Sequence, residues 1–165
     1  MKKIRFRGLF KHSVDHKGRV AIPHPFRKIL LSSKNGVLVL VKGYDGEIEV
    51  HPLKEWERFE EDILLALPYY KKSNRRFRRR RTFSATEVAI DSQGRIMLPK
   101  HLIEYARVET EVIITGNITY FEIWSPEVYE RFLKESEAHQ EEDSETLDRF
   151  LNRGKSDIPL PSDEE

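Results

Sequence analysis

The chain contains an internal duplication, and this feature restricts its fold more than any other in the 165 residues. Residues 14–23 align with residues 90–99, 76 positions later, with identical Asp, Gly, Arg and Pro and conservative changes at three apolar positions. Two downstream pairs of segments also correspond: 37–41 with 112–115, and 47–52 with 121–126. A repeat of this kind indicates one structural unit that was copied and packs against its copy. We therefore predict two related modules.

The centre of each copy has a β-type pattern. In the second copy Val88, Ile90, Ile96 and Leu98 alternate with other residues, which is the period of a half-buried strand. Residues 91–94 separate the two runs and have Asp first and Gly fourth, as expected for a type I turn. Residues 15–18 have the same pattern. We predict in each copy a hairpin closed by a bulged turn.

Helices are predicted between and after these strands. They cover residues 25–31, 53–67, 100–107 and 126–136, with one or two more amphipathic turns in 144–152. In the second of them Trp56, Phe59, Ile63 and Leu67 recur at three- and four-residue steps and define one apolar face. The fold class expected from these patterns is mainly β with accessory helices, that is, α+β.

The same patterns suggest five segments. They are a first module in 6–54, a helical and basic connector in 55–83, a second module in 84–128, C-terminal helices in 129–152, and an acidic, disordered tail in 153–165. A tail that is rich in charge and carries Pro159 and Pro161 lacks the apolar residues needed for a core.

Charge is distributed unevenly along the chain, although the formal net charge is only +1. Residues 1–50 carry 11 Lys and Arg against 4 Asp and Glu, whereas residues 71–81 carry 8 bases and no acid. Residues 135–165 carry 11 acids against 3 bases. Such asymmetry suggests a polyanionic partner. Three interpretations of 71–81 are open: a solvated face, pairing with acidic surfaces of a neighbouring subunit, or contacts to DNA phosphates.

The duplicated Asp-x-x-Gly-Arg is the strongest functional signal. Because strand residues alternate between faces, Arg19 and Arg95 are expected on the outer face beside their turns. Each arginine can pair with the Asp of its own turn, or present its guanidinium to phosphate or to the O6/N7 edge of guanine. Both roles are compatible. The predicted DNA-binding residues are Arg19 and Arg95 with Lys17 and Gln93 as helpers, and the predicted turn-shaping residues are Asp15, Gly18, Asp91 and Gly94.

Catalytic and membrane functions are not supported by the sequence. It has no cysteine, which excludes disulfides and thiolate sites, and its six histidines lack metal-ligand spacing. No nucleophile elbow, phosphate-binding glycine loop, secretory signal or run of about 20 apolar residues is present. We expect a cytosolic protein that is not an enzyme and has no cofactor, metal, membrane contact or small-molecule substrate.

The duplicated Asp-x-x-x-Arg resembles the signature of the MraZ family of bacterial transcriptional regulators, which are built from two SpoVT-AbrB modules. It stands here as Asp15-His16-Lys17-Gly18-Arg19 and Asp91-Ser92-Gln93-Gly94-Arg95. Flanking residues agree as well, at 6–8, 22–23, 26–27, 74–76 and 121–124, and the resemblance covers about residues 6 to 135. One departure is 105–108, where the family usually has Ala-Gly-Leu.

This resemblance implies a double-split, swapped-hairpin AbrB-like β-barrel formed by the two repeats. It also implies a ring-like homo-oligomer that binds double-stranded DNA at repeated G-rich boxes, in the bacterial nucleoid. The expected role is repression of the division and cell-wall gene cluster and of its own promoter, with Arg19 and Arg95 matching the family's DNA-contacting arginines. Two alternatives are open: a non-catalytic protein-interaction module of antitoxin type, and single-stranded RNA binding.

Overall fold

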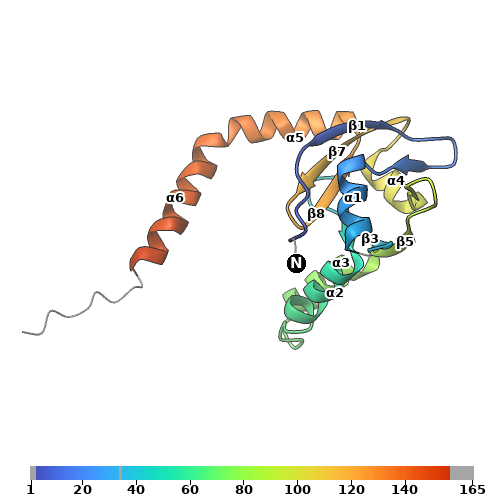
Figure 1. Ribbon diagram of the computed structural model, residues 1–165. Helices are drawn as coiled ribbons and strands as arrows, with labels where there is room; N and C mark the ends of the chain where they lie inside the picture. Colours follow the sequence, from blue (N-terminus) through green and yellow to red (C-terminus); the bar gives the residue numbers. More distant parts are fainter. Residues whose placement is uncertain (1–2, 34, 157–165) are drawn as a thin grey trace, which may run out of the picture. The chain divides into compact units, whose positions relative to one another are not determined.

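A computed structural model describes residues 3–33 and 35–156 of the chain (Figure 1). It divides into two compact units, residues 1–129 and 130–165. In chain order the elements of the first repeat are β1 (Leu9–Ser13), β2 (Arg19–Ala21), α1 (His24–Ser32), β3 (Val37–Lys42), β4 (Ile48–Pro52) and α2 (Leu53–Phe59), followed by the π-helix η1 (Glu60–Leu64) and α3 (Lys72–Phe83). The second repeat contributes β5 (Thr86–Ala89), β6 (Arg95–Met97), α4 (Lys100–Ala106), β7 (Glu111–Asn117), β8 (Tyr120–Trp124) and α5 (Pro126–Ala138), and α6 (Gln140–Ser156) follows.

The two repeats have the same order of elements, β-β-α-β-β-α, and together form an α+β fold, which confirms the predicted class. A six-stranded antiparallel sheet has the order β1-β7-β8-β4-β3-β5, and a two-stranded ribbon joins β2 to β6. The first strand of each repeat therefore pairs with the third strand of the other, β1 with β7 and β5 with β3. Neither repeat builds its sheet alone, so the two copies are mutually dependent for their backbone hydrogen bonds.

The main hydrophobic core lies on one face of the large sheet. Sheet residues such as Ile48 and Phe121 pack there against Phe26 of α1 and Leu102 of α4, and against the inward residues of the ribbon. Phe6, Phe26 and Phe121 form a ring cluster with centroids 5.1–5.4 Å apart. Burial of these side chains supplies the main driving force that holds the ribbon on the sheet.

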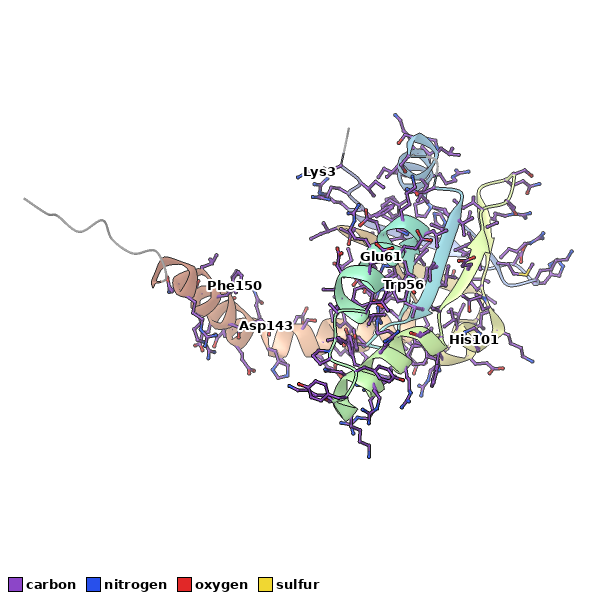
Figure 2. The ribbon with its side chains drawn as sticks, turned by 90° about the horizontal axis from the view of Figure 1, so that it is seen from below. Lys3, Trp56, Glu61, His101, Asp143 and Phe150 are labelled. Atoms are coloured by element: carbon purple, nitrogen blue, oxygen red, sulfur yellow. The ribbon has the colours of Figure 1, made fainter. Side chains whose placement is uncertain are left out.

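A smaller core lies on the opposite face, where α2 and α3 lie side by side (Figures 1 and 2). Val39 and Val41 of β3 contact the indole of Trp56 in α2, which Figure 2 labels between the helix and the strand. The two faces of β3 are thus both covered, and four of its six residues are buried. This explains why β3 reads as a continuous apolar run instead of an alternating one.

The first of the two predicted hairpins is only one bridge wide. Val14 forms an isolated bridge with Val20, and beyond it β1 and β2 separate to pair with β7 and β6. Both predicted turns are present, but the strands on either side of each turn pair mainly with strands of the other repeat. Strand alternation specifies which face a residue occupies but not which strand lies beside it.

The predicted helix over residues 53–67 changes its winding in the middle. Leu53–Phe59 is α-helical, and Glu60–Leu64 is a π-helix with one extra residue in its turn. The extra residue rotates the following side chains, so Leu64 is buried with 3% exposure while Ile63 is 46% exposed. Ile63 is therefore not on the apolar face predicted from a regular helix, and Leu64 takes its place.

The C-terminal region is more helical than predicted. Helix α6 begins at Gln140 and runs to Ser156, beyond the expected 144–152. Residues 153–156 of the predicted disordered tail thus continue the helix, and the remainder of that tail lies outside the described residues. Arg149 and Arg153 lie in the C-terminal half of α6, where positive charge favours the helix dipole. Within residues 3–33 and 35–156, no helix has both the length and the apolar composition that crossing a membrane requires.

Candidate nucleic-acid interface

Each duplicated motif folds into a compact turn held by its aspartate. In the first turn, Asp15 Oδ1 accepts hydrogen bonds from the backbone N–H groups of Lys17 and Arg19, both at 2.9 Å. The N–H of Gly18 donates to the Asp15 carbonyl at 3.0 Å, and Gly18 has a φ of +80°. An L-residue rarely adopts this left-handed conformation, which is why the fourth position is glycine.

The second turn repeats this geometry. Asp91 Oδ1 accepts from the backbone N–H groups of Gln93 and Arg95 at 2.9 Å, and Gly94 donates to the Asp91 carbonyl at 3.0 Å with a φ of +74°. Backbone N–H donation from Arg95 is the main factor that holds the pKa of Asp91 below its ordinary value. For Asp15 the corresponding N–H of Arg19 leads the same effect and lowers the pKa to about 2. Both aspartates are therefore ionised at neutral pH.

The ionised aspartates also orient the arginines. Arg19 Nε donates to Asp15 Oδ2 at 2.7 Å, and Arg95 Nε donates to Asp91 Oδ2 at 3.0 Å. A guanidinium has five N–H donors, so this contact leaves the terminal amino groups of each arginine for another partner. The two side chains are 25% and 27% exposed. Each arginine is thus held in place but still accessible to solvent.

The two turns belong to one structural unit. The Leu98 N–H donates to the Gly18 carbonyl at 2.9 Å, and the Ile22 N–H donates to the Gly94 carbonyl at 3.0 Å, so each turn is bonded to the other repeat. Between them the ribbon pairs Arg19 with Met97 and Ala21 with Arg95.

The register of the ribbon places both arginines on the same face. Val20 and Ile96 point into the core, and strand alternation directs Arg19 and Arg95 to the opposite side. Arg95 Nη1 lies 3.9 Å from Asp15 Oδ2 of the other turn. The structure therefore brings together the predicted site residues of both copies, and Lys17 and Gln93 are exposed beside them. Among the residues placed in the structure, no group of three or more His, Asp or Glu is arranged to hold a metal ion.

Arg27 of α1 is a residue beside the second turn that the sequence did not single out. A β-carbon at Gly94 would clash with the Arg27 side chain, whereas a β-carbon at Gly18 would lie 3.2 Å from Cδ1 of Ile103. Residues 27 and 103 occupy equivalent positions in the two repeats. The second turn is thus backed by a cation and the first by an aliphatic side chain. A comparison of equivalent positions outside the shared motif, such as 27 and 103, would have revealed this difference from the sequence.

Replacing Gly94 with alanine tests how tightly the second turn is constrained. We expect Gly94→Ala to destabilise the protein by about 1–2 kcal/mol, because alanine at this φ is strained and its methyl group displaces Arg27. Gly36→Ala is the matched control, since no heavy atom lies within 4 Å of a β-carbon there. Urea unfolding of both variants measures the difference. Equal stability of the two variants would show that the turn tolerates a side chain.

One arginine of the basic connector is buried in an ion pair. Arg81, near the end of α3, lies 2.7 Å from Glu49 Oε2, and the two side chains are only 7% and 5% exposed. Its guanidinium also lies 5.0–5.7 Å from the ring centroids of Tyr44, Trp56 and Phe59. Arg81 therefore fastens α3 to the sheet and is not available to a partner. This role could not be predicted from the sequence, because nothing in the run of arginines at 75–81 distinguishes Arg81 from the others.

Comparisons with known proteins agree in pointing to one family. The family described as "MraZ protein, putative antitoxin-like" matches residues 5–80 and 83–151. A protein of Caldanaerobacter subterraneus named "Transcriptional regulator MraZ" is 43% identical over 87% of this chain and 96% of its own length. Proteins of the same name from Carboxydothermus hydrogenoformans and Pediococcus pentosaceus are 40% and 39% identical over 88% of this chain and over 99% and 98% of their own lengths.

Proposed function

The chain belongs to the MraZ family, and from this membership together with the two arginine-bearing turns we propose that it is a sequence-specific double-stranded DNA-binding regulator of transcription. Relatives that align over nearly their whole length are named transcriptional regulators, which supports a DNA-binding role. The protein is therefore assigned a binding role, and the turns are its candidate reading surface.

The observation that carries this proposal is the ribbon with Arg19 and Arg95 on one outer face. The major groove of B-DNA is about 12 Å wide and admits a two-stranded β-ribbon. Because Asp15 and Asp91 occupy the Nε atoms, the terminal amino groups of the arginines are the donors left for O6 and N7 of guanine. Lys17 and Gln93, exposed on the same turns, are placed to contact flanking phosphates or bases.

The finer parts of the proposal rest on the family. We propose that the target is a set of repeated G-rich boxes upstream of the division and cell-wall gene cluster, and that binding represses this cluster and the protein's own promoter. A ring-like homo-oligomer would engage several boxes at once and gain affinity through effective concentration. The interleaved pairs β1–β7 and β3–β5 support a swapped-hairpin, AbrB-like barrel as the fold of the two modules. Such a protein acts in the cytoplasm, associated with the nucleoid.

Fluorescence anisotropy with duplex DNA tests the DNA-binding proposal. The duplex is taken from upstream of the protein's own gene and compared with a scrambled duplex of equal length and composition at one near-physiological salt concentration. We expect a preference of at least about 100-fold for the native duplex, within the usual range of specific over non-specific binding. Affinity for both duplexes should fall steeply with salt, since each phosphate contact releases counterions. Equal affinity for the two would reject sequence-specific recognition.

A second candidate is a protein-interaction module of antitoxin type, which the words "antitoxin-like" in the family description favour. In that case a toxin-sized reading frame would lie beside the gene, and its product would co-purify with this chain at a fixed ratio. A chain that binds neither duplex but retains such a partner would favour this second function.

A further inference from the structure

We infer that helix α6 of one copy of the chain docks on the α3 groove of a second copy, the hollow lined by Tyr69, Arg75, Arg78, Arg79, Thr82 and Phe83. The proposed function includes self-association without saying which surfaces meet, and this inference, which rests on that part of it, supplies them. The groove and the helix come from different parts of the chain.

The α3 groove is both basic and aromatic. It has a volume of about 430 Å³, and Phe83 at its edge is 81% exposed. Arg75 is held by donating to the carbonyls of Tyr69 and Tyr70 at 2.9 and 2.8 Å, and the guanidinium of Arg78 lies 5.5 Å from the centre of the Tyr69 ring. The groove is thus organised by its own contacts before any partner arrives.

The arginines of the groove lack an acidic partner. Within residues 3–33 and 35–156, no ion pair to a carboxylate is formed by Arg75, Arg78 or Arg79, in contrast to Arg81 on the same helix. Exposed tyrosine, phenylalanine and arginine together are the residue types that dominate the energetics of protein interfaces. A groove of this composition suits an amphipathic segment with apolar and acidic side chains on one face.

Helix α6 has that face. Leu147, Phe150 and Leu151 follow the i, i+3, i+4 spacing that lines up side chains along one side of a helix, and all three are exposed, Phe150 by 74%. At 100° per residue, Asp143 lies in line with this apolar stripe, one turn before Leu147, and Asp148 borders the stripe on one side. Figure 2 labels Asp143 and Phe150 on this helix. An apolar stripe with one aspartate in line with it and a second along one side complements a groove that combines aromatic rings with arginines.

A second copy of the chain is the occupant that the chemistry favours. Every copy carries one such helix and one such groove, so the two surfaces are always present in equal number. Because the helix and the groove are different surfaces, the contact between two copies is heterologous. Each copy can then dock its helix on one neighbour and receive the helix of another neighbour in its groove, as in a closed ring. A DNA backbone would satisfy the arginines of the groove but would leave the exposed ring of Phe83 in contact with water.

Charge reversal tests the contact, with light scattering after size exclusion as the readout of mass. We expect the wild-type chain to have the mass of an oligomer, and both Arg79→Glu and Asp148→Arg to reduce it to that of one chain. Mixing these two variants should restore dimers, because the mixture offers one intact groove and one intact helix. The double variant should regain an oligomer through the reversed pair. Arg76→Glu and Glu145→Arg make equal charge changes, outside the groove and away from the stripe, and should leave the mass unchanged.

The outcomes that overturn the inference are distinct from failure of DNA recognition. A wild-type chain of single-chain mass, unchanged mass in both single variants, or no recovery in the mixture and the double variant would each refute the contact. If Arg79→Glu kept the oligomer but weakened binding to duplex DNA, whereas Arg76→Glu did not, the groove would be a phosphate contact and the inference would be wrong. Mass is measured without DNA, so it reports on this contact whether or not the turns read a sequence.

Discussion

The double variant Arg19→Ala/Arg95→Ala is expected to lose the preference for the native upstream duplex over the scrambled one. A bidentate contact between arginine and guanine contributes about 1–3 kcal/mol of discrimination, or about 5- to 150-fold per arginine. Two such contacts in one chain would together contribute about 2–6 kcal/mol, which covers the expected preference of about 100-fold. Anisotropy titrations against both duplexes at one salt concentration measure this change.

Replacement by lysine separates specificity from charge. Arg19→Lys/Arg95→Lys keeps both positive charges but lacks the planar fork that holds two acceptors at once. We expect this variant to retain most of the affinity for scrambled DNA and to lose the preference for the native duplex. Two results would contradict the assignment of these arginines as base-reading residues: an alanine double variant that keeps its preference, or a lysine variant that behaves like the wild type.

The second large effect is expected at the buried ion pair of Arg81 and Glu49. Removing one partner leaves an uncompensated charge in a site where both side chains are more than nine-tenths buried, and such changes cost about 3–5 kcal/mol. We expect both Arg81→Met and Glu49→Gln to lower the free energy of unfolding by this amount, and the double variant to lose less than the two singles combined. Urea unfolding of the four proteins forms a double-mutant cycle.

An exposed ion pair on the neighbouring helix provides the control for that cycle. Arg58 and Glu55 of α2 lie 3.4 Å apart near the surface, so Arg58→Met should cost less than about 1 kcal/mol. A loss at Arg81 no greater than that at Arg58 would show that the buried pair does not fasten α3 to the sheet.

The buried pair should also respond to acid in a defined direction. Burial tends to raise the pKa of Glu49, but the hydrogen bond with His51 and the charge of Arg81 outweigh it and hold the pKa below its ordinary value of 4.5. A carboxyl with a lowered pKa contributes stability that is present above its unfolded-state pKa and is lost as pH falls through the folded-state value. The stability difference between wild type and Glu49→Gln should therefore persist at neutral pH and shrink as the pH falls below 4.5.

Local features of the site were accessible from the sequence, because they depend on residues close together in the chain. Asp and Gly at fixed positions specify a turn whatever surrounds it, and the side of the strand on which Arg19 and Arg95 lie follows from alternation. The partner of each strand was not accessible, since the same alternation suits pairing within a repeat or between repeats. The buried role of Arg81 was equally hidden, because its partner Glu49 is distant in sequence and its neighbours in the run are also arginines.

The unequal support behind the two turns, Arg27 at Gly94 and Ile103 at Gly18, has a consequence for the symmetry of the DNA that such a protein can read. In a homodimer every substitution appears in both halves, which favours palindromic targets. When both halves are encoded in one chain, this restriction to identical halves no longer applies. A substitution can then change one turn without changing the other, while the shared ribbon still holds the two turns side by side. If the two turns read DNA as proposed, the two halves of a target need not be inverted copies of each other.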